Sequence, residues 1–456
     1  MTDVTRLERT DVSALRERVA GGVLAPGDDG YDSARMPWQR RHDPRPAVIV
    51  DARGVADVVA AIRFAREHDL PLAVQATGHG MVRPADDGVL LRTAAMASVE
   101  VDRSRRTARV GAGALWGDVI AAAAPYGLAP LSGSSPTVGV VGYTLGGGTG
   151  WLSRAYGYAA DSVVRAEVVT ADGSLVSAED HPDLFWALRG GSGNFGVVTA
   201  LEFRLFPVSD VYAGMAMFDA DRAADVMAVY RDWALAEPDA SNTALVVAQM
   251  PPVPQVPEPV RGKRVLMLRA FYLGAAEEAE ALLAPLRDAA GPPLLDGLRA
   301  TSFADAAAMM PPPPPSVSVM GFDLFRTVPD EVIAAAVETD GAIAGVELRH
   351  WGGAMSRPSE TAGPIGHRDI PFSVVDAAQS TDPAATDDLV AAVDAFAARV
   401  RPHATGGSFL NFLGDPDRIA NAYTPDDYRR LTEVKATWDP DNLFRANLNI
   451  PPVSAA

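Results

Sequence analysis

A glycine-rich stretch from Gly133 to Gly150 constrains this chain more than any other feature of its sequence. Seven of these eighteen residues are glycine, which is more backbone freedom than a turn requires. Such main chain lets a ligand approach closely, and outward-pointing N–H groups suit an anion such as a diphosphate. The alternative is a glycine-rich surface loop or a tightly packed strand pair. Val138, Val140, Val141 and Leu145 lie between the glycines and favour a buried site.

The common nucleotide-binding motifs do not explain this stretch. Trp151 stands where a dinucleotide fingerprint would place its third glycine after Gly146 and Gly148, and no GxxxxGK[ST] motif occurs. A complete G-x-G-x-x-G motif runs from Gly191 to Gly196. It follows a helix-like segment and leads into a strand-like one, whereas a Rossmann loop runs from strand to helix. An ordinary NAD site is therefore not expected.

Length and charge narrow the function classes. With 456 residues the chain is long enough for two or three domains, and its formal net charge of -18 argues against nucleic acid or an anionic membrane as partner. No apolar run is long enough to span a bilayer, and the charged N-terminus does not resemble a secretory signal. The absence of cysteine excludes disulfides and thiolate metal sites. We expect a cytoplasmic monomer or homodimer.

The first half of the chain predicts a β-α-β unit. Strands at 47–51 and 70–75 flank a helix with apolar residues at helical spacing over 55–65, and the second strand leads to His79. Asp11 or Ser13 is expected to cap an N-terminal helix. Further strands are expected at 88–92, 99–102, 107–113 and 197–206, a hairpin at 162–177, and helices at 115–126 and 182–189.

The character of the sequence changes near Pro207. From there to about Thr405, strands are expected at 244–250, 264–273, 322–327, 344–351 and 372–377, and alanine-rich helices at 222–237, 275–289, 331–338 and 387–400. Thirteen of the 36 prolines lie between Pro251 and Pro315 and predict loops. These loops are interpreted either as covers of an active-site mouth or as a rigid polyproline spacer.

The last fifty residues predict one helix over 425–437 and an extended tail. Asn411, Asn442, Asn447 and Asn449 sit among apolar residues, and buried amides must be hydrogen-bonded. A turn explains Asn442, which follows Pro-Asp. For Asn411 and Asn449 a ligand is the preferred interpretation.

Several segments, lying in the same order, resemble the berberine bridge enzyme-like branch of the vanillyl-alcohol oxidase superfamily. The matching segments are RPAVIV with DVVAAIRFAREHDLPLAVQATGHG, TARVGAGALWGDV, SPTVGVVGYTLGGGTGWLSRAYG, DLFWALRGGSGNFGVVTALEFRLFP, HWGGAMSRPSETAGPIGHR and VKATWDPDNLFRANLNIPP. The resemblance implies an α+β fold with a bipartite PCMH-type FAD-binding domain and a substrate domain whose antiparallel sheet is covered by helices. The implied parts are 1–206 for FAD, 207–405 for substrate, and 406–456 returning to the FAD domain.

The resemblance also implies the cofactor site. His79 matches the family histidine that bonds covalently to the flavin 8α-methyl group. The implied cofactor-binding residues are Gln75, Ala76, Thr77, Gly78, His79, Gly80, Ser134, Ser135, Val138, Gly139, Gly142, Tyr143, Gly146, Gly147, Gly148, Gly196, Val197, Val198, Asn447 and Asn449.

The chain departs from the family pattern at several positions. Ser135 stands where many members carry a cysteine that makes a second flavin bond, so one covalent attachment is expected. Gln75 and Thr77 replace the usual arginine and glycine before the histidine. Phe412 replaces a tyrosine that acts as base in parts of the family, so that role does not carry over.

The proton acceptor for a flavin oxidation must come from the substrate domain or the glycine stretch. The candidates are Asp376, Glu347, His350 and Tyr143, and we expect catalytic roles for Asp376, Tyr143 and Asn411. Asp376 is alternatively a solvent-facing residue at a strand end. Tyr143 either donates a hydrogen bond to the flavin or substrate, or has only a packing role in the protein.

Together these features predict an FAD-dependent oxidase that oxidises a C–H next to oxygen or nitrogen in a small natural product or sugar. The small Val138 resembles the residue of oxygen-using members, so O2 is the expected acceptor. The alternative is a flavin dehydrogenase, or a flavin-binding protein without oxidation chemistry. A hydrolase or metal enzyme is disfavoured, because no G-x-S-x-G motif and no closely spaced histidine pair occurs. Aromatic residues that predict either a substrate pocket or core are Trp351, Phe372, Phe409 and Phe412.

Overall fold

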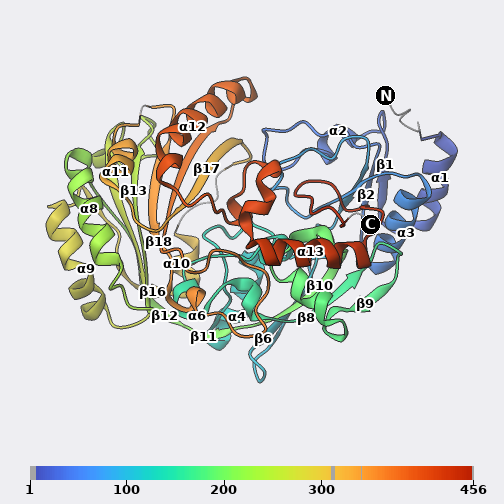
Figure 1. Ribbon diagram of the computed structural model, residues 1–456, viewed down its shortest axis with the longest axis horizontal. Coiled ribbons are helices and arrows are strands. Elements are labelled where there is room, and N and C mark those ends of the chain that lie inside the picture. The colour runs from blue at the N-terminus through green and yellow to red at the C-terminus, as the bar shows by residue number, and fades with distance from the viewer. Residues whose placement is uncertain (1–6, 310–313, 340, 454–456) are drawn as a thin grey trace.

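The computed structural model describes residues 7–309, 314–339 and 341–453. Figure 1 shows two halves side by side: small sheets from the first half of the chain on the right, and one large sheet with its helices on the left. The C-terminal segment, red in Figure 1, runs back across the first half, and both ends of the chain lie on that side. The α+β fold class predicted from the sequence is confirmed.

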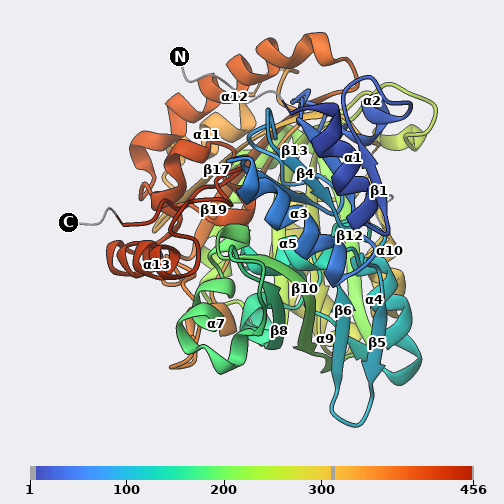
Figure 2. The ribbon, with the colours of Figure 1, turned by 90° about the vertical axis from the view of Figure 1, so that its right-hand side faces the viewer.

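A four-stranded sheet carries the predicted β-α-β unit. Strands β2 and β3 both pair in parallel with β4, and helix α3 connects β2 to β3. Figure 2 shows α3 close to β4. Val58, Ile62 and Ala65 of this helix are fully buried. In sheet order the strands are β1 (Gly22–Leu24), β2 (Val48–Asp51), β4 (Val89–Arg92) and β3 (Leu72–Gln75), and the helices are α1 (Arg9–Arg18), α2 (Tyr31–Ala34) and α3 (Val55–Glu67).

The predicted cap of the N-terminal helix is wrong. Helix α1 starts at Arg9, so Asp11 and Ser13 lie inside it. The N-cap position is held by Glu8, whose backbone N–H donates to the Asp11 carboxylate at 3.0 Å. Asp11 therefore acts one turn inside the helix, as the third residue of a capping box.

A second, antiparallel sheet follows, and its predicted hairpin is confirmed. Strands β8 and β9 pair around Ala171-Asp172-Gly173, and helix α7 leads into β10 through the G-x-G-x-x-G motif, in the helix-to-strand order expected. In sheet order the strands are β5 (Val99–Asp102), β6 (Thr107–Gly111), β10 (Val197–Arg204), β8 (Val163–Val169) and β9 (Leu175–Ser177), beside β7 (Leu128–Ala129) paired with β11 (Phe206–Pro207). The helices are α4 (Trp116–Ala123), α5 (Val140–Leu145), α6 (Ser153–Tyr156) and α7 (Pro182–Leu188).

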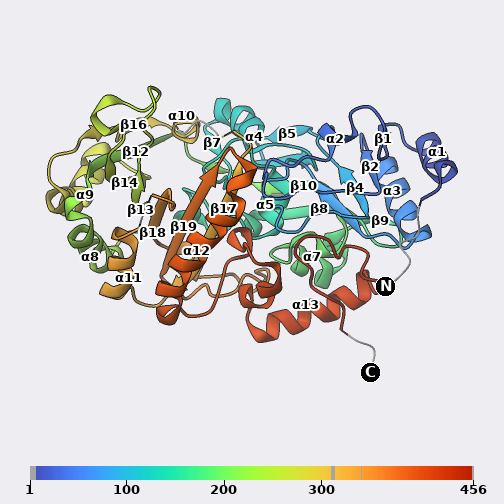
Figure 3. The same ribbon diagram turned by 90° about the horizontal axis from the view of Figure 1, so that it is seen from above.

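The second half of the chain forms one large antiparallel sheet. Its strands are β15 (Leu295–Asp296), β12 (Asp210–Asp219), β14 (Arg264–Tyr272), β13 (Ser241–Gln249), β18 (Gly345–His350), β19 (Phe372–Ser380) and β17 (Val317–Phe325), with β16 (Arg299–Ser302) also on β12. Four helices cover one face, as Figure 3 shows: α8 (Ala223–Ala234), α9 (Ala276–Ala290), α11 (Asp330–Val337) and α12 (Thr386–Val400). The sequence-based prediction missed β12, β15, β16 and α10 (Phe303–Ala308).

Strand alternation decides which side chains of this sheet face the helices. Val346 and Leu348 of β18 join the core beneath the helices, as do Val374 and Ala378 of β19. Since neighbouring residues of a strand point to opposite faces, Glu347 points the other way. The uncovered face, turned toward the first half of the chain, therefore carries the odd-numbered residues of β18.

The C-terminal segment packs onto the first half of the chain. Helix α13 (Pro425–Trp438) contacts α7, and its fully buried Lys435 donates to the Asn194 carbonyl at 2.8 Å and to Asp439 at 2.6 Å. Farther on, the Ile450 N–H donates to the Asn194 side chain at 2.9 Å. Asn194 thus anchors the helix and the tail to the loop before β10.

Pro285 belongs to two predictions that exclude each other, a helix over 275–289 and a proline-rich loop, and the helix is confirmed. Pro285 is inside helix α9, where the buried Ala279, Leu283 and Leu286 hold the helix against the sheet. This apolar face offsets the lost backbone hydrogen bond. The prolines at 311–313 lie outside the described residues.

Candidate active site

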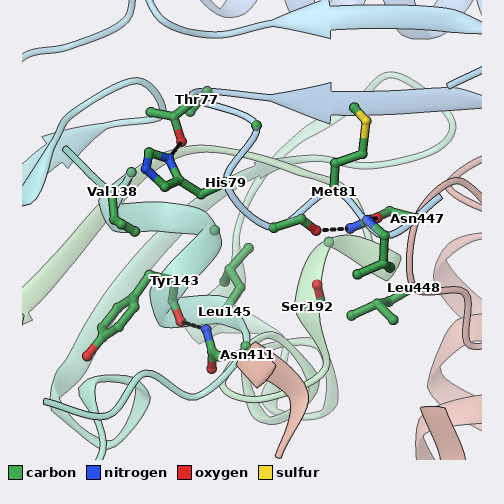
Figure 4. A pocket seen from close by; sticks show the side chains of 18 of the residues that line it. Thr77, His79, Met81, Val138, Tyr143, Leu145, Ser192, Asn411, Asn447 and Leu448 are labelled. Atoms are coloured by element: carbon green, nitrogen blue, oxygen red, sulfur yellow. Dashed lines mark hydrogen bonds between the residues drawn. The ribbon is translucent and has the colours of Figure 1, made fainter. Parts of the chain in front are cut away.

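A cavity of about 590 Å³ lies where the three segments of the chain meet. Its lining comes from the loop after β3, the glycine stretch around α5, the segment before β10, the uncovered face of the large sheet and the C-terminal tail. All the predicted cofactor residues line it except Gly147, Gly148 and Asn449. Figure 4 shows how the labelled side chains are arranged.

His79 projects from the loop after β3. Its Nδ1 is hydrogen-bonded to the Thr77 hydroxyl at 2.9 Å (Figure 4). Its ring stacks on Trp38, with 4.3 Å between the ring centroids and an interplanar angle of 12°. Burial lowers the pKa of His79 to about 4. The imidazole is therefore neutral and held in one orientation at neutral pH.

The glycines of the central stretch serve two different purposes. A Cβ atom on Gly142 would meet nothing within 4 Å, so main chain is open to the cavity at this position. A Cβ on Gly146 would instead lie 2.9 Å from the Asn411 amide, and Gly148 has a φ of +72° with the Tyr143 ring against it. Gly142 is thus open to a ligand, whereas Gly146 and Gly148 are required by close packing. The stretch contains helix α5 and not the strand pair of the alternative interpretation.

Asn411 holds this stretch in place. Its Nδ2 donates to the Tyr143 carbonyl at 2.9 Å, and its Oδ1 accepts from the Gly148 N–H at 3.0 Å. Both ends of the amide are engaged by main chain. Both contacts support a positioning role for Asn411, and the catalytic role expected for it stays a prediction.

Asn447 fastens the loop that carries His79. Its Nδ2 donates to the Gly80 carbonyl at 3.0 Å, its Oδ1 accepts from the Val82 N–H at 2.8 Å, and its φ is +64°. Asn442 also has a positive φ, and its N–H donates to the Asp439 carbonyl, as a turn requires.

Orphaned polar atoms at the cavity fit a bound group. Gln75 Oε1 and the Tyr143 hydroxyl are buried, belong to lining residues and have no hydrogen-bond partner in the described part of the chain. Gly80, Gly142 and Gly193 present bare main chain, since a Cβ on each would meet open space. Buried polar groups are normally satisfied, so the lining is suited to a long, polar cofactor.

Asp376 lies on the wrong face of β19 for the role expected of it. It is 3% exposed, does not line the cavity, and packs its carboxylate against Gly321 of β17 on the helix-covered side. Burial raises its pKa to about 7. His350 also points to that side, where it bonds Glu237 at 3.0 Å. Both placements argue against contact with a substrate.

Glu347 is the candidate carboxylate on the cavity side. It bridges Arg269 at 2.7 Å and Arg349 at 2.6 Å, and all three line a second cavity of about 270 Å³ beside Phe412. Both arginines also line the main cavity. The sequence-based prediction did not include these arginines. Each lies among apolar residues in its strand, β14 or β18, and such a charged residue could have been recognised as a candidate.

Of the four aromatic residues predicted to line a pocket or to belong to the core, one lines a cavity and three are core residues. Phe412 lines both cavities and stacks on Phe322 at 5.2 Å. Phe372 is buried among the helices, and Trp351 and Phe409 contact each other in a separate core cluster. The pocket interpretation therefore holds for Phe412.

Family models match both segments that build the cavity's cofactor side. The model described as FAD binding domain matches residues 46–179, and the model described as berberine and berberine like matches residues 408–451. These matches confirm the resemblance to berberine bridge enzyme-like FAD-linked oxidoreductases over both segments. The chain is an FAD-linked oxidoreductase with a small-molecule substrate.

Full-length relatives agree with this assignment. The chain is 29% identical to (R)-6-hydroxynicotine oxidase of Paenarthrobacter nicotinovorans, covering 95% of this chain and 97% of the relative, and 27% identical to the FAD-linked oxidoreductase YgaK of Bacillus subtilis, covering 96% and 98%. The solved 6-hydroxy-D-nicotine oxidase of Arthrobacter nicotinovorans superposes with a TM-score of 0.83 at 26% identity, covering 95% and 98%. Berberine bridge enzyme of Eschscholzia californica shares the fold, with a TM-score of 0.84 at 20% identity, covering 98% and 100%.

The described residues lack two kinds of structural feature. No helix there combines the length and the apolar composition needed to cross a bilayer. The same residues contain no group of three or more histidine, aspartate or glutamate side chains placed to hold a metal ion.

Proposed function

We propose that this enzyme is an oxidase that carries FAD on a single covalent bond to His79 and passes electrons from its substrate to O2. The observation that carries this proposal is the neutral, oriented imidazole of His79 at the wall of a cavity lined by bare main chain. When bound, FAD accepts a hydride equivalent from a substrate C–H next to oxygen or nitrogen.

The chain's own residues suit one attachment. Thr77 occupies Nδ1 of His79, which leaves Nε2 as the ring nitrogen available for the bond. Ser135, hydrogen-bonded to Thr137 at 3.1 Å, cannot supply a thioether. Acid precipitation tests the bond, because covalently attached flavin stays with the denatured protein.

Glu347 takes the proton-accepting role in this proposal. It lies on the uncovered sheet face, whereas Asp376 faces the helices. Tyr143 stays a neutral phenol, because burial raises its pKa well above its usual value, and its unpartnered hydroxyl is free to hydrogen-bond a bound group. Substrate would thus lie between the glycine stretch and the sheet.

The choice of O2 rests on Val138 and on the relatives. Val138 lines the cavity, and the relative with 29% identity is named an oxidase of a nitrogen heterocycle. Rapid re-oxidation of the anaerobically reduced enzyme in air, with release of hydrogen peroxide, is the expected result. Slow re-oxidation would favour the alternative of a dehydrogenase, and absence of turnover would favour a flavin-binding protein without oxidation chemistry. The cytoplasmic location and the monomeric or dimeric state stay predictions.

A further inference from the structure

The cavities carry a charge opposite to that of the whole protein. The chain has 40 basic and 58 acidic side chains, yet the charged residues lining the two cavities are Arg41, Arg83, Arg269 and Arg349 against one carboxylate, Glu347, among the residues that the structure describes. Arg83 follows the loop that carries His79, and Arg41 belongs to the segment whose Trp38 stacks on His79. The other two arginines project from β14 and β18 of the large sheet.

These sheet arginines form a compact cluster with Glu347. The Arg269 Nη1 lies 2.7 Å from one carboxylate oxygen and the Arg349 Nη2 lies 2.6 Å from the other. The Arg269 guanidinium sits 5.0 Å above the Trp151 ring, and its buried Nε has no hydrogen-bond partner within the described chain. Two guanidinium groups and one carboxylate leave one positive charge uncompensated in a partly buried site, which is costly unless an anion completes it.

We propose that the substrate carries a carboxylate, which Arg269 and Arg349 bind on the uncovered face of the sheet. This rests on the proposed function only in taking the cavity as the substrate site. A planar carboxylate matches the guanidinium fork and adds the single negative charge that neutralises the cluster. Met267, Val375 and Phe412 line the smaller cavity and accommodate an apolar body next to the carboxylate.

The cofactor's diphosphate is the competing occupant. The bare main chain at Gly80, Gly142 and Gly193 belongs to the first half of the chain, whereas the cluster belongs to the sheet of the second half. The glycine main chain therefore suits the diphosphate, which leaves the sheet arginines for the substrate.

Calorimetric titration of the flavin-loaded enzyme tests this inference without turnover. The probes are benzoate and phenylacetate, each compared with its uncharged amide. Carboxylates are expected to bind at least ten-fold more tightly than the amides, and Arg349→Gln to weaken carboxylate binding about 10- to 100-fold with amide binding unchanged. Arg349→Lys is expected to fall in between, because lysine keeps the charge without the fork. Arg326→Gln, at an exposed ion pair with Asp369, is the matched control and should match the wild type.

Three results would overturn the inference. They are equal binding of acid and amide, equal carboxylate affinity in the wild type and Arg349→Gln, and loss of flavin from Arg349→Gln, which would assign the arginine to the cofactor. Carboxylate binding without peroxide-releasing turnover would instead count against the proposed oxidase and leave the inference standing. Turnover of a neutral alcohol or amine by an enzyme that binds no carboxylate would overturn this inference and leave the proposed oxidase standing.

Discussion

The imidazole of His79 and the hydroxyl of Thr77, two residues apart on one loop, are hydrogen-bonded at 2.9 Å. This contact and the stacking on Trp38 orient the ring and leave Nε2 for the proposed flavin bond. We expect Thr77→Val, which removes the hydroxyl at nearly constant volume, to lower the fraction of flavin that stays with acid-precipitated protein by several-fold. Thr77→Ser keeps the hydroxyl and should retain most of it. Equal fractions of covalently bound flavin in Thr77→Val and Thr77→Ser would show that the Thr77 hydroxyl does not orient His79.

Asn447 links the tail to the loop behind His79 through its bonds to Gly80 and Val82. Asn447→Ala removes these bonds and places alanine at a positive φ, so the free energy of unfolding should fall by about 1–3 kcal/mol. Urea unfolding of the flavin-loaded protein measures this change. Asn447→Asp keeps the acceptor for Val82 and should lose less. An alanine variant as stable as the wild type would show that the tail does not secure this loop.

Glu347 and Asp376 provide a matched pair of carboxylates on opposite faces of one sheet. Glu347→Gln should lower kcat by about 10²–10⁴-fold, because it removes the proposed proton acceptor. Asp376→Asn should change kcat by less than about three-fold, since ordinary replacements away from the site perturb stability more than chemistry. The kcat of each variant is measured by steady-state kinetics that follow peroxide release. A larger loss of kcat in Asp376→Asn than in Glu347→Gln would instead identify Asp376 as the proton acceptor.

Burial of Asp376 predicts a pH dependence of stability. Its pKa is about 7 in the folded protein and 3.8 in a model peptide, so between these pH values the folded state holds a proton that the unfolded state releases. Stability should therefore fall as pH rises from about 4 to about 7 and stay lower above that. Asp376→Asn, which stays neutral, should recover about 1–4 kcal/mol at pH 8 relative to pH 4. If the free energies of unfolding of the wild type and of Asp376→Asn changed equally with pH, Asp376 would not be the source of the pH dependence.

Much of the fold was predictable because its strong signals are local. The apolar periodicity of α3, the hairpin between β8 and β9, and the proline at the start of α7 each identify an element without tertiary information. Strand β12 was missed because Gly214 and small residues interrupt its pattern. Gly214 faces the main chain at Gly297, a tertiary contact that no local pattern reveals.

The candidate site was less predictable, because direction depends on register. A shift of one residue moves a side chain to the opposite face of a strand, which is why Asp376 faces the helices although it was expected at the site. The asparagines show a second limit. Asn411 and Asn447 hold main chain by contacts across more than 260 residues of sequence, and nothing near them in the sequence specifies those partners.

The covalent bond between His79 and FAD is tested most directly by the mass of the purified, acid-denatured protein, measured together with the visible spectrum of the pellet. Such a bond predicts a yellow pellet and a chain heavier by one FAD, and a colourless pellet of unmodified mass for His79→Ala. A wild-type protein that releases all its flavin on denaturation, or one that retains flavin after His79→Ala, would contradict it.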